Sequence, residues 1–486
     1  MSIDIIARGL AAAQARSANT SALVKAVRNN AFFPQPAFRC PTGDVATITV
    51  PAANAVSVIN AGAATAANVP VTNTAKITWL CGTADKDVNV TYSARGGWYA
   101  GGRANNYTSY EFQHTGTQLE VQILCSAVSP GTSNFRVLVN DRVAGTASVP
   151  NDGGNRLVRV VFPSSATRRV RIELAGGRHR GLNLASVNEV VNIGRNYPLV
   201  TLIGDSFPEG TGANPYDGEG ISTLRAIGCN PASAGVGATG ILNPGSGGKV
   251  NWQDANRLAD LALNGWTDQI TNAPVTPAMG VIMMSLNDIG LGSTLWNGAA
   301  TLQEAVTKGV WTMVDHWQTQ RPGKPLVVFG PTWTSESPIL DIFRLRDAGQ
   351  EACHGAGPNV WFLDRLGPGT RLRRGTRSVT ATTGATTLAS KLITGLGSTA
   401  NLTIYSAISG AGIPAGARVM TIDSATQVTI DINCTATAAG VAITFQNDQT
   451  AIYTDTDGVH PNQAGHNLDS LWMARELRSL ILSELS

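Results

Sequence analysis

Two histidines near the end of the chain are the residues whose types and spacing most directly suggest chemistry. The sequence has only 6 His in 486 residues, yet His460 and His466 both lie in the stretch YTDTDGVHPNQAGHNLDSLW, and Asp457 stands three places before the first. Three interpretations are open: a metal site, a general base with a carboxylate that orients it, or ordinary polar surface.

A metal site is the weakest of the three interpretations. Six residues of an α-helix turn through about 240°, so His460 and His466 would point to different sides, whereas two histidines that share a metal on one helix are four apart. No Cys or Glu is spaced to complete a ligand set. We therefore expect no metal and no cofactor, and we interpret His466 as a packed or surface residue inside a helix.

A catalytic base fits the local sequence better. Pro461 and Asn462 are typical of a helix start, with Asn462 as the N-cap, which places Asp457 and His460 on the loop just before the helix. An aspartate there can accept a hydrogen bond from one imidazole nitrogen and leave the other nitrogen to take a proton. His460 is therefore the candidate base, and Asp457 is the carboxylate that would orient it.

A base of this kind needs a nucleophile, and a serine that follows an apolar run supplies a candidate. In VTLIGDSFPEGTG the apolar run ends at Gly204, Asp205 and Ser206. A serine at the carboxyl end of a buried strand, in a tight turn that contains glycine, directs its hydroxyl towards the crevice where α/β proteins bind ligands. The segment is not the GxSxG turn of the α/β-hydrolases, and a Gly-Asp-Ser tripeptide taken alone is more often only a turn.

Acyl transfer also requires hydrogen-bond donors for an oxyanion, because the loss of one donor typically slows such a reaction by about 10²–10³. The segment SAGVGATG contains Gly237, whose backbone N–H a ligand can approach closely. The segment MMSLNDIG follows an apolar run and offers the side-chain amide of Asn287. We expect Asp288, beside it, to cap the segment that follows.

The elements that must position these residues have an α/β pattern. The apolar runs PLVTLIG, MGVIMMSLND, KPLVVFGPTW and NVWFLDR are typical of strands buried on both faces of a parallel sheet. Two amphipathic helices accompany them. Their predicted apolar faces are Leu302, Val306, Val310, Met313 and Trp317 in the first, and Leu468, Leu471, Trp472, Leu477 and Ile481 in the second. We expect a doubly wound α/β domain with helices on both faces of the sheet.

The chain divides further on either side of this pattern. Residues 1–45 are predicted to be a lead-in or attachment segment. Residues 46–195 contain about seven short β-branched runs punctuated by Gly, Asn, Asp and Pro, which predicts a β-sandwich of the jelly-roll kind. Residues 376–447, nearly devoid of carboxylates, predict a small β module inserted into the α/β domain, which then comprises 196–375 and 448–486.

The amino-acid composition limits the kinds of partner that we expect this protein to bind. Lys+Arg 36 against Asp+Glu 33 leaves a formal net charge of +3 without a basic run, so we expect no nucleic acid. No apolar run of about 18 residues exists, so we expect no membrane insertion. Arg8 interrupts the first apolar stretch, so we expect no secretory signal peptide. The 6 Cys show no CxxC pairing and are interpreted as buried free thiols.

These motifs, taken together and in this order, resemble the SGNH (GDSL-like) hydrolase family of esterases. That family uses the Ser of a Gly-Asp-Ser block, a Gly, the Asn of an Asn-Asp block, and the Asp and His of an Asp-x-x-His block near the C-terminus. The resemblance implies a catalytic triad with Ser206 as nucleophile, His460 as base and Asp457 as its orienting partner. The oxyanion would then be held by the amides of Ser206 and Gly237 and by Asn287.

Two positions depart from the family pattern. Ser285 stands where a glycine is usual, two residues before Asn287, and the second block lacks its customary Asn. That block is also one residue shorter, so Gly235 competes with Gly237 for the same role. The resemblance covers about 197–375 and 448–486.

The accessory regions extend the resemblance. The β region ahead of the hydrolase is similar to the jelly roll that precedes some SGNH carbohydrate esterases, and SGAGIPAGARVMTIDSATQVTI is similar to small β modules of bacteriophage tail proteins. Together they imply a virion-borne, extracellular deacetylase that removes O-acetyl groups from a bacterial surface polysaccharide. Its partners would be that acetylated polysaccharide and other phage tail proteins. In the alternative interpretation, both β regions are only spacers or elements that trimerise the chain as a homotrimer.

Weaker assignments and other classes stay open. Trp333 follows a strand end near the expected crevice and would stack on a sugar ring. Arg178, His179 and Arg180 would bind an acidic glycan or, as we expect, form a solvated loop. A lipase or thioesterase would use the same catalytic residues, a non-catalytic glycan-binding tail adhesin would retain only the fold, and a structural tail component would show neither activity.

Overall fold

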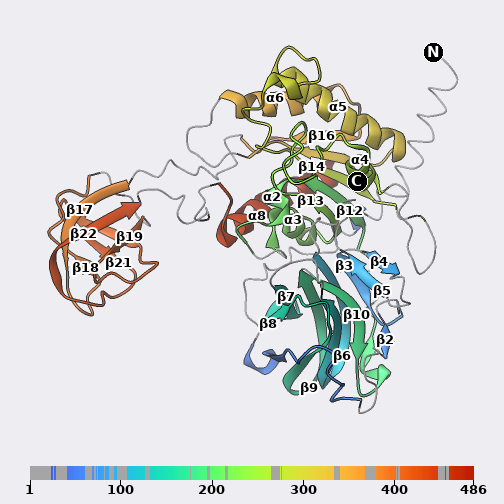
Figure 1. Cartoon of the computed structure of the whole chain (residues 1–486), viewed down its shortest axis with the longest axis horizontal. Helices are drawn as coiled ribbons and strands as arrows, with labels where there is room; N and C mark the ends of the chain where they lie inside the picture. Colours follow the sequence, from blue (N-terminus) through green and yellow to red (C-terminus); the bar gives the residue numbers. More distant parts are fainter. Residues whose placement is uncertain are drawn as a thin grey trace. The chain divides into compact units, whose positions relative to one another are not determined.

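The chain folds into two compact units in the computed structural model shown in Figure 1. Unit 1 comprises Met1–Pro331, Arg344–Arg365 and Asn467–Ser486, and unit 2 comprises Thr332–Phe343 and Leu366–His466. The structure describes residues 23–25, 27–28, 41–60, 68–70, 73, 75–81, 83–86, 92–95, 107–125, 132–175, 177–193, 197–213, 217–263, 274, 276–332, 340–366, 379–400, 402, 406–446, 455 and 459–485.

A five-stranded parallel sheet is the centre of the α/β part of unit 1. Its strands are β12 (Leu199–Gly204), β13 (Asn230–Gly235), β14 (Met279–Met283), β15 (Leu326–Phe329) and β16 (Val360–Leu363). They lie in the order β13-β12-β14-β15-β16, which is the doubly wound order 2-1-3-4-5. The predicted parallel sheet of buried apolar strands is confirmed, and its switch point, where such folds bind ligands, lies between β12 and β14.

Helices cover both faces of this sheet (Figure 1). The helices are α2 (Ser206–Glu209), α3 (Glu219–Ala226), α4 (Ala255–Ala262), α5 (Leu302–Gln320), α6 (Leu340–His354) and α8 (Gln463–Glu484). On one face, Leu224 of α3 and Leu477 of α8 share a core with Val200. On the other, Trp317 of α5 lies against Gly280 of β14, where an added Cβ would come within 2.8 Å of the indole.

The two predicted helical faces differ in outcome. The face on α5 is confirmed, because all five predicted residues are buried. The face on α8 is partly wrong: Leu468 and Leu471 are 37% and 40% exposed. The buried stripe instead runs through His466, Ser470, Met473, Ala474, Leu477 and Ile481. The first two residues of this stripe are polar. A prediction from hydrophobicity alone therefore missed them and placed the start of the buried face on the wrong residues.

Part of the predicted lead-in segment belongs to the α/β core. Leu23, Val24 and Val27 are buried in the same cluster as Val200. The guanidinium of Arg478 on α8 donates a 2.6 Å hydrogen bond to the carbonyl of Val27. This stretch therefore stabilises the α/β part, whereas an attachment role for the lead-in stays a prediction.

An 11-stranded antiparallel sheet is formed by the strands before β12. Its two longest strands, β6 (Tyr107–Cys125) and β9 (Asn155–Ala175), pair along most of their length, with a register shift between Gly116 and Gln118. The others are β1 (Thr47–Thr49), β2 (Val69–Pro70), β3 (Thr78–Cys81), β4 (Thr83–Lys86), β5 (Tyr92–Arg95), β7 (Thr132–Val139), β8 (Arg142–Pro150), β10 (Gly177–Asn183) and β11 (Val190–Val191). The β structure predicted for this region is confirmed in the residues that the structure describes, and its jelly-roll arrangement stays a prediction.

One expectation for this sheet is wrong. Arg178, His179 and Arg180 lie on strand β10 rather than on a solvated loop. His179 is fully buried, and its ring lies edge-on to Tyr110 at a centroid distance of 4.7 Å. The triplet has no apolar residue to mark it as a strand, but pairing with both β5 and β6 places it inside the sheet.

Unit 2 contains two small antiparallel sheets of three strands each. One consists of β17 (Val379–Thr386), β22 (Ala438–Gln446) and β19 (Ala407–Gly410), and the other of β18 (Leu392–Ile393), β21 (Gln427–Ile430) and β20 (Val419–Ser424). Ile393, Val428 and Phe445 share one core. The β structure predicted for this segment is confirmed.

Cysteine burial and helix hydropathy test two composition-based expectations. Cys229, Cys353 and Cys434 are buried free thiols, as predicted for these three. Cys40 lies outside the described residues, and so do the side chains of Cys81 and Cys125. Within the described ranges, the helices lack an apolar stretch of the length that crossing a bilayer requires.

Candidate active site

Ser206 is the first residue of α2 and follows the carboxyl end of β12 directly. The Asp205 carboxylate caps this short helix by accepting a 2.9 Å hydrogen bond from the amide of Phe207. Gly210 ends it with φ 89, and its amide donates to the carbonyl of Ser206 at 3.1 Å. Gly204 allows the sharp turn, because an added Cβ would lie 2.3 Å from the ring of Pro208. The predicted placement of Ser206 is confirmed, and its role as nucleophile stays a prediction.

Gly237 follows β13 and lies against Ser206. A Cβ built on Gly237 would lie 3.4 Å from the Cβ of Ser206 and 2.6 Å from Oε2 of Glu209. The Gly237 amide donates a 2.7 Å hydrogen bond to that same Oε2 atom. The carbonyl of Gly237, in the next peptide group, accepts a 2.6 Å hydrogen bond from Lys249 Nζ. The amide expected to hold an oxyanion therefore lies beside Ser206 and binds a carboxylate.

The rival residue Gly235 has a different place. It is the last residue of β13, in register with Gly204 of β12. An added Cβ on Gly235 would lie 2.7 Å from the backbone nitrogen of Glu209, so this glycine lets α2 pack closely on the strand. Gly235 thus serves close backbone packing, while Gly237 is the glycine whose amide meets an anion.

Asn287 joins the same site through Ser285. The Ser285 hydroxyl donates a 2.6 Å hydrogen bond to Asp205 Oδ2 and accepts one of 2.9 Å from the backbone amide of Asn287. The side-chain amide of Asn287 donates to the carbonyl of Thr239 at 3.0 Å. That amide group has two N–H bonds, so one remains for another acceptor. The serine that departs from the family pattern therefore ties the Asn287 loop to the cap of α2.

Asp288 does not have the predicted capping role. Its carboxylate accepts three hydrogen bonds of 2.9 Å from the consecutive amides of Ile241, Leu242 and Asn243. Gly240 makes room for it, since an added Cβ would lie 2.5 Å from Asp288 Oδ1. Asp288 thus holds the loop that follows Gly237, some fifty residues earlier in the chain. The expectation that Asp288 caps the segment after it is wrong.

Burial and a neighbouring ion pair set the charge of Asp205. Burial raises the pKa of Asp205 to about 6, although the hydrogen bonds from Ser285 and Phe207 act in the opposite direction. Among the smaller contributions to this value, Glu219 on α3 raises the pKa and Arg365 lowers it. Arg365 lies 2.9 Å from Glu219 and 3.7 Å from Asp469 of α8, so it connects the two helices on this face of the sheet.

Sequence reasoning missed two functional candidates, Glu209 and Arg365. Glu209 stands three residues after Ser206, and this helical spacing would have indicated that both side chains lie on one face of α2. Arg365 is the last residue of the predicted run NVWFLDR, at the carboxyl end where a parallel sheet places its functional side chains.

The helix start proposed near His460 is present. Asn462 Oδ1 accepts a 3.0 Å hydrogen bond from the amide of Gly465, so Asn462 caps α8 as predicted. His460 is half-buried, and its carbonyl accepts a 2.8 Å hydrogen bond from the amide of Asp455. His466 is fully buried inside the helix, in agreement with its interpretation as a packed residue.

Asp457 and Trp333 lie outside the described residues. His460 belongs to unit 2 and Ser206 to unit 1, and their pairing stays a prediction. Within the described part of the chain, no group of three or more His, Cys, Asp or Glu side chains is arranged to hold a metal ion.

Comparison with known proteins yields matches to solved structures alone. No family model and no curated protein matches the chain. A family two carbohydrate esterase from Cellvibrio japonicus has 12% sequence identity and a TM-score of 0.45 over 66% of this chain and 89% of its own. An acetyl xylan esterase (Est2A) from the rumen bacterium Butyrivibrio proteoclasticus has 13% identity and a TM-score of 0.42 over 66% and 89%.

A third solved structure is similar over more of the chain. It is the salicylyl-acyltransferase SsfX3 from a tetracycline biosynthetic pathway, with 13% identity and a TM-score of 0.46 over 85% of this chain and 97% of its own. At these identities and TM-scores the likeness assigns no residue and no activity. The assignment of site residues rests on the contacts described above.

Proposed function

We propose that the protein is a serine ester hydrolase in which Ser206 is the nucleophile. The observation that carries this proposal is the arrangement of Ser206, Gly237 and Glu209. The Gly237 amide lies beside the Ser206 side chain and donates a 2.7 Å hydrogen bond to a carboxylate oxygen. A backbone N–H that binds an oxygen anion next to a serine is the feature that acyl transfer requires.

Three donors would share the oxyanion of the tetrahedral intermediate. They are the Gly237 amide, the Ser206 amide at the start of α2, and the second N–H of the Asn287 side chain. The Asp205–Ser285–Asn287 hydrogen bonds hold the last two in a fixed relation. Because Glu209 and an oxyanion would compete for the Gly237 amide, we expect the Glu209 carboxylate to leave that amide when an ester binds.

His460 is the proposed base, oriented by Asp457. Helix α8 is continuous from Gln463 to Glu484, and its later residues Met473 and Leu477 lie in the same core as Val200 of β12. His460 precedes the first turn of this helix by three residues. Its pairing with Ser206 is part of this proposal.

The reaction follows from these roles. The Ser206 oxygen forms a bond to the ester carbonyl carbon while His460 takes the hydroxyl proton, and the carbonyl oxygen becomes the bound oxyanion. The intermediate then expels the alcohol, which receives the proton from His460. Water, activated by the same imidazole, attacks the acyl-enzyme and releases the acid. No cofactor takes part in these steps.

The proposed substrate is an O-acetyl group of a bacterial surface polysaccharide, and the proposed setting is a phage tail. The support is the domain content: an 11-stranded β-sheet precedes the hydrolase, and a small β module interrupts it. Such β modules suit presentation of an enzyme to an extended polymer. Trp333 remains a proposed sugar-stacking residue, and assembly with other tail proteins, as a homotrimer, is part of the same proposal.

Acid release tests this function. Wild-type protein should hydrolyse p-nitrophenyl acetate and release acetate from acetylated bacterial polysaccharides, and Ser206→Ala should abolish both reactions without altering the circular dichroism spectrum. Faster hydrolysis of long-chain than of acetyl esters would indicate a lipase or thioesterase. Binding of polysaccharide without acid release would indicate an adhesin, and unchanged turnover in Ser206→Ala would exclude Ser206 as nucleophile.

A further inference from the structure

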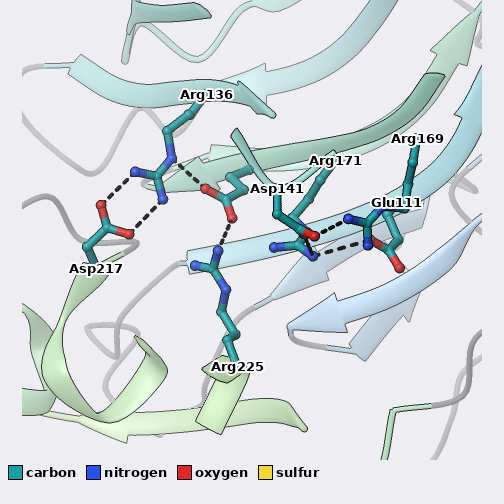
Figure 2. A network of polar contacts seen from close by, with 8 residues as sticks. Glu111, Arg136, Asp141, Arg169, Arg171, Asp217 and Arg225 are labelled. Carbon is teal, nitrogen blue, oxygen red and sulfur yellow. Dashed lines mark hydrogen bonds and ion pairs between the residues drawn. The ribbon is translucent and has the colours of Figure 1, made fainter. Parts of the chain in front are cut away.

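A buried network of charged side chains joins the 11-stranded sheet to the α/β part of unit 1 (Figure 2). Its members are Glu111, Arg136, Asp141, Arg169, Arg171, Glu173, Asp217 and Arg225. Four of them are arginines and four are carboxylates, so their formal charges cancel. Asp217 and Arg225 come from the α/β part, Asp141 comes from the turn between β7 and β8, and the other five come from strands of the sheet.

Arg136 is the side chain that spans the two parts. Its Nε donates to Glu173 on β9 at 2.6 Å, within the sheet. Its two terminal nitrogens donate to the two oxygens of Asp217 at 2.6 and 2.8 Å. Arg136 is 3% exposed and Asp217 5% exposed, so this two-pronged pair is screened from water. A guanidinium bound in this way defines the orientation of its carboxylate as well as its distance.

Glu173 links Arg136 to helix α3. Burial on its own would raise the pKa of Glu173, but Arg136, Arg225 and Arg171 outweigh it and lower the pKa below its ordinary value. Arg225 of α3 approaches the second oxygen of Glu173 at 2.9 Å. The sheet therefore holds α3 at two points, through Asp217 just before the helix and through Arg225 in its last turn.

The segment that Arg136 holds is in contact with the helix that carries Ser206. Asp217 is followed by Gly218, where an added Cβ would lie 2.9 Å from the Cα of Gly210 and 3.1 Å from the carbonyl oxygen of Pro208. Pro208 belongs to α2 and Gly210 ends it. The backbone of 217–218 thus packs directly on α2, with no side chain between them.

We propose that Arg136 is a positioning residue for Ser206, so that the accessory sheet acts in catalysis without touching the substrate. The inference rests on the proposed esterase function. Arg136 fixes Asp217, the backbone of Gly218 then limits where α2 can lie, and α2 places the Ser206 hydroxyl. Buried ion pairs add little net stability but define geometry, and a misplacement of about 1 Å in a catalytic group costs about 10² in rate.

Hydrogen exchange measures the position of α2 without reference to activity. The amides of Gly210 and Thr211 donate to the Ser206 carbonyl, so their exchange reports whether α2 is closed. In the full chain, Arg136→Lys and Asp217→Asn should each speed exchange in peptides covering 205–211 about tenfold, with no change in the peptide covering β15. Arg171→Lys is the matched control, because it alters a second buried arginine, which pairs with Glu111 and Asp141 and not with Asp217.

Kinetics complete the test and separate the two proposals. With p-nitrophenyl acetate, Arg136→Lys should lower kcat at least tenfold with little change in KM, whereas Arg171→Lys should lower the melting temperature alone. Unchanged exchange at 205–211 in both Arg136→Lys and Asp217→Asn, or equal effects from Arg171→Lys, would overturn the inference while leaving esterase activity intact. An inactive wild-type protein that still shows the selective exchange effect would refute the esterase function and retain the positioning role.

Discussion

The backbone amide of Gly237 donates a 2.7 Å hydrogen bond to the carboxylate of Glu209, three residues after Ser206 in the chain. The Glu209 carboxylate therefore occupies a backbone N–H that could otherwise bind an oxyanion next to the proposed nucleophile. We expect the Glu209 carboxylate to compete for this N–H with, and to repel, the oxyanion that would form on the carbonyl oxygen of an ester bonded to Ser206. This contact gives Glu209 a direct influence on the rate of the proposed reaction.

Replacing Glu209 by Gln should raise activity. The neutral amide of Glu209→Gln would bind Gly237 more weakly and remove a negative charge beside the developing oxyanion. We expect kcat/KM for a neutral acetyl ester to rise roughly three- to tenfold, which corresponds to about 1 kcal/mol of transition-state stabilisation. Glu304→Gln, which removes a carboxylate from the surface of α5, should leave kcat/KM unchanged. A fall in kcat/KM for Glu209→Gln would show that the carboxylate supports the reaction.

The Ser285 hydroxyl links the cap of α2 to the Asn287 loop, and its removal should weaken both. Ser285→Ala leaves Asp205 Oδ2 and the Asn287 amide without the partner they have now, and a buried unsatisfied group costs about 1–3 kcal/mol. We expect the free energy of unfolding to fall by this amount in urea titrations and kcat to fall by about tenfold.

Ser222→Ala is the matched control for this variant. Ser222 is a buried serine on α3 whose hydroxyl has no hydrogen-bond partner among the described residues. Its loss should leave the free energy of unfolding unchanged or slightly higher. If Ser222→Ala and Ser285→Ala changed the free energy of unfolding equally, the Ser285 hydrogen bonds would not account for the loss of stability.

Protonation of Asp205 should make stability depend on pH. Its pKa is about 6 in the folded protein, against an ordinary value of 3.8. Between these values the folded state holds a proton that the unfolded state has lost. The stabilisation is therefore fully present below pH 3.8 and is lost as pH rises through 6. The whole effect is about 3 kcal/mol, because one pKa unit corresponds to 1.36 kcal/mol.

Asp205→Asn should remove this dependence. An Asn side chain can still accept from Phe207, and its NH₂ can donate to Ser285, whose proton can turn to the Thr239 carbonyl 3.2 Å away. Urea titrations from pH 4 to 8 should show a flatter profile than wild type and a more stable variant at pH 8. Asp288→Asn, by contrast, would place its NH₂ group next to a backbone N–H, and two donors repel each other. This variant should be less stable than wild type from pH 4 to 8. If the free energy of unfolding depended on pH in Asp205→Asn as it does in wild type, the dependence would not come from Asp205.

The sequence predicted those parts of the fold that depend on local pattern. Continuous apolar runs indicated the buried parallel strands, and the short Gly-Asp-Ser turn after the first of them placed Ser206 at a carboxyl end. The segment SAGVGATG indicated the close approach of a ligand to the Gly237 amide, although the strand before it was not predicted. These features follow from hydrophobic periodicity and backbone freedom, which are properties of neighbouring residues.

Features that depend on distant polar partners were not predictable in this way. Arg136 and Asp217 are separated by 81 positions, and nothing in either segment signals the other. The buried face of α8 begins with His466 and Ser470, because the Ser470 hydroxyl donates to the Glu219 carbonyl on α3. Asp288 was expected to act on its own neighbourhood, but its carboxylate meets three amides across the site. Charge and hydrogen-bond complementarity appear only once the chain is folded.

If His460 activates Ser206, as we propose, the rate of covalent labelling by a serine-directed fluorophosphonate reports that activation. In wild-type protein, mass spectrometry should find the label on Ser206. His460→Gln should slow labelling by about 10³ or more, since the base is required to take the hydroxyl proton. His354→Gln, which alters an exposed histidine on α6, should label at the wild-type rate. Labelling of His460→Gln as fast as wild type, or an active enzyme labelled at another residue, would contradict the account.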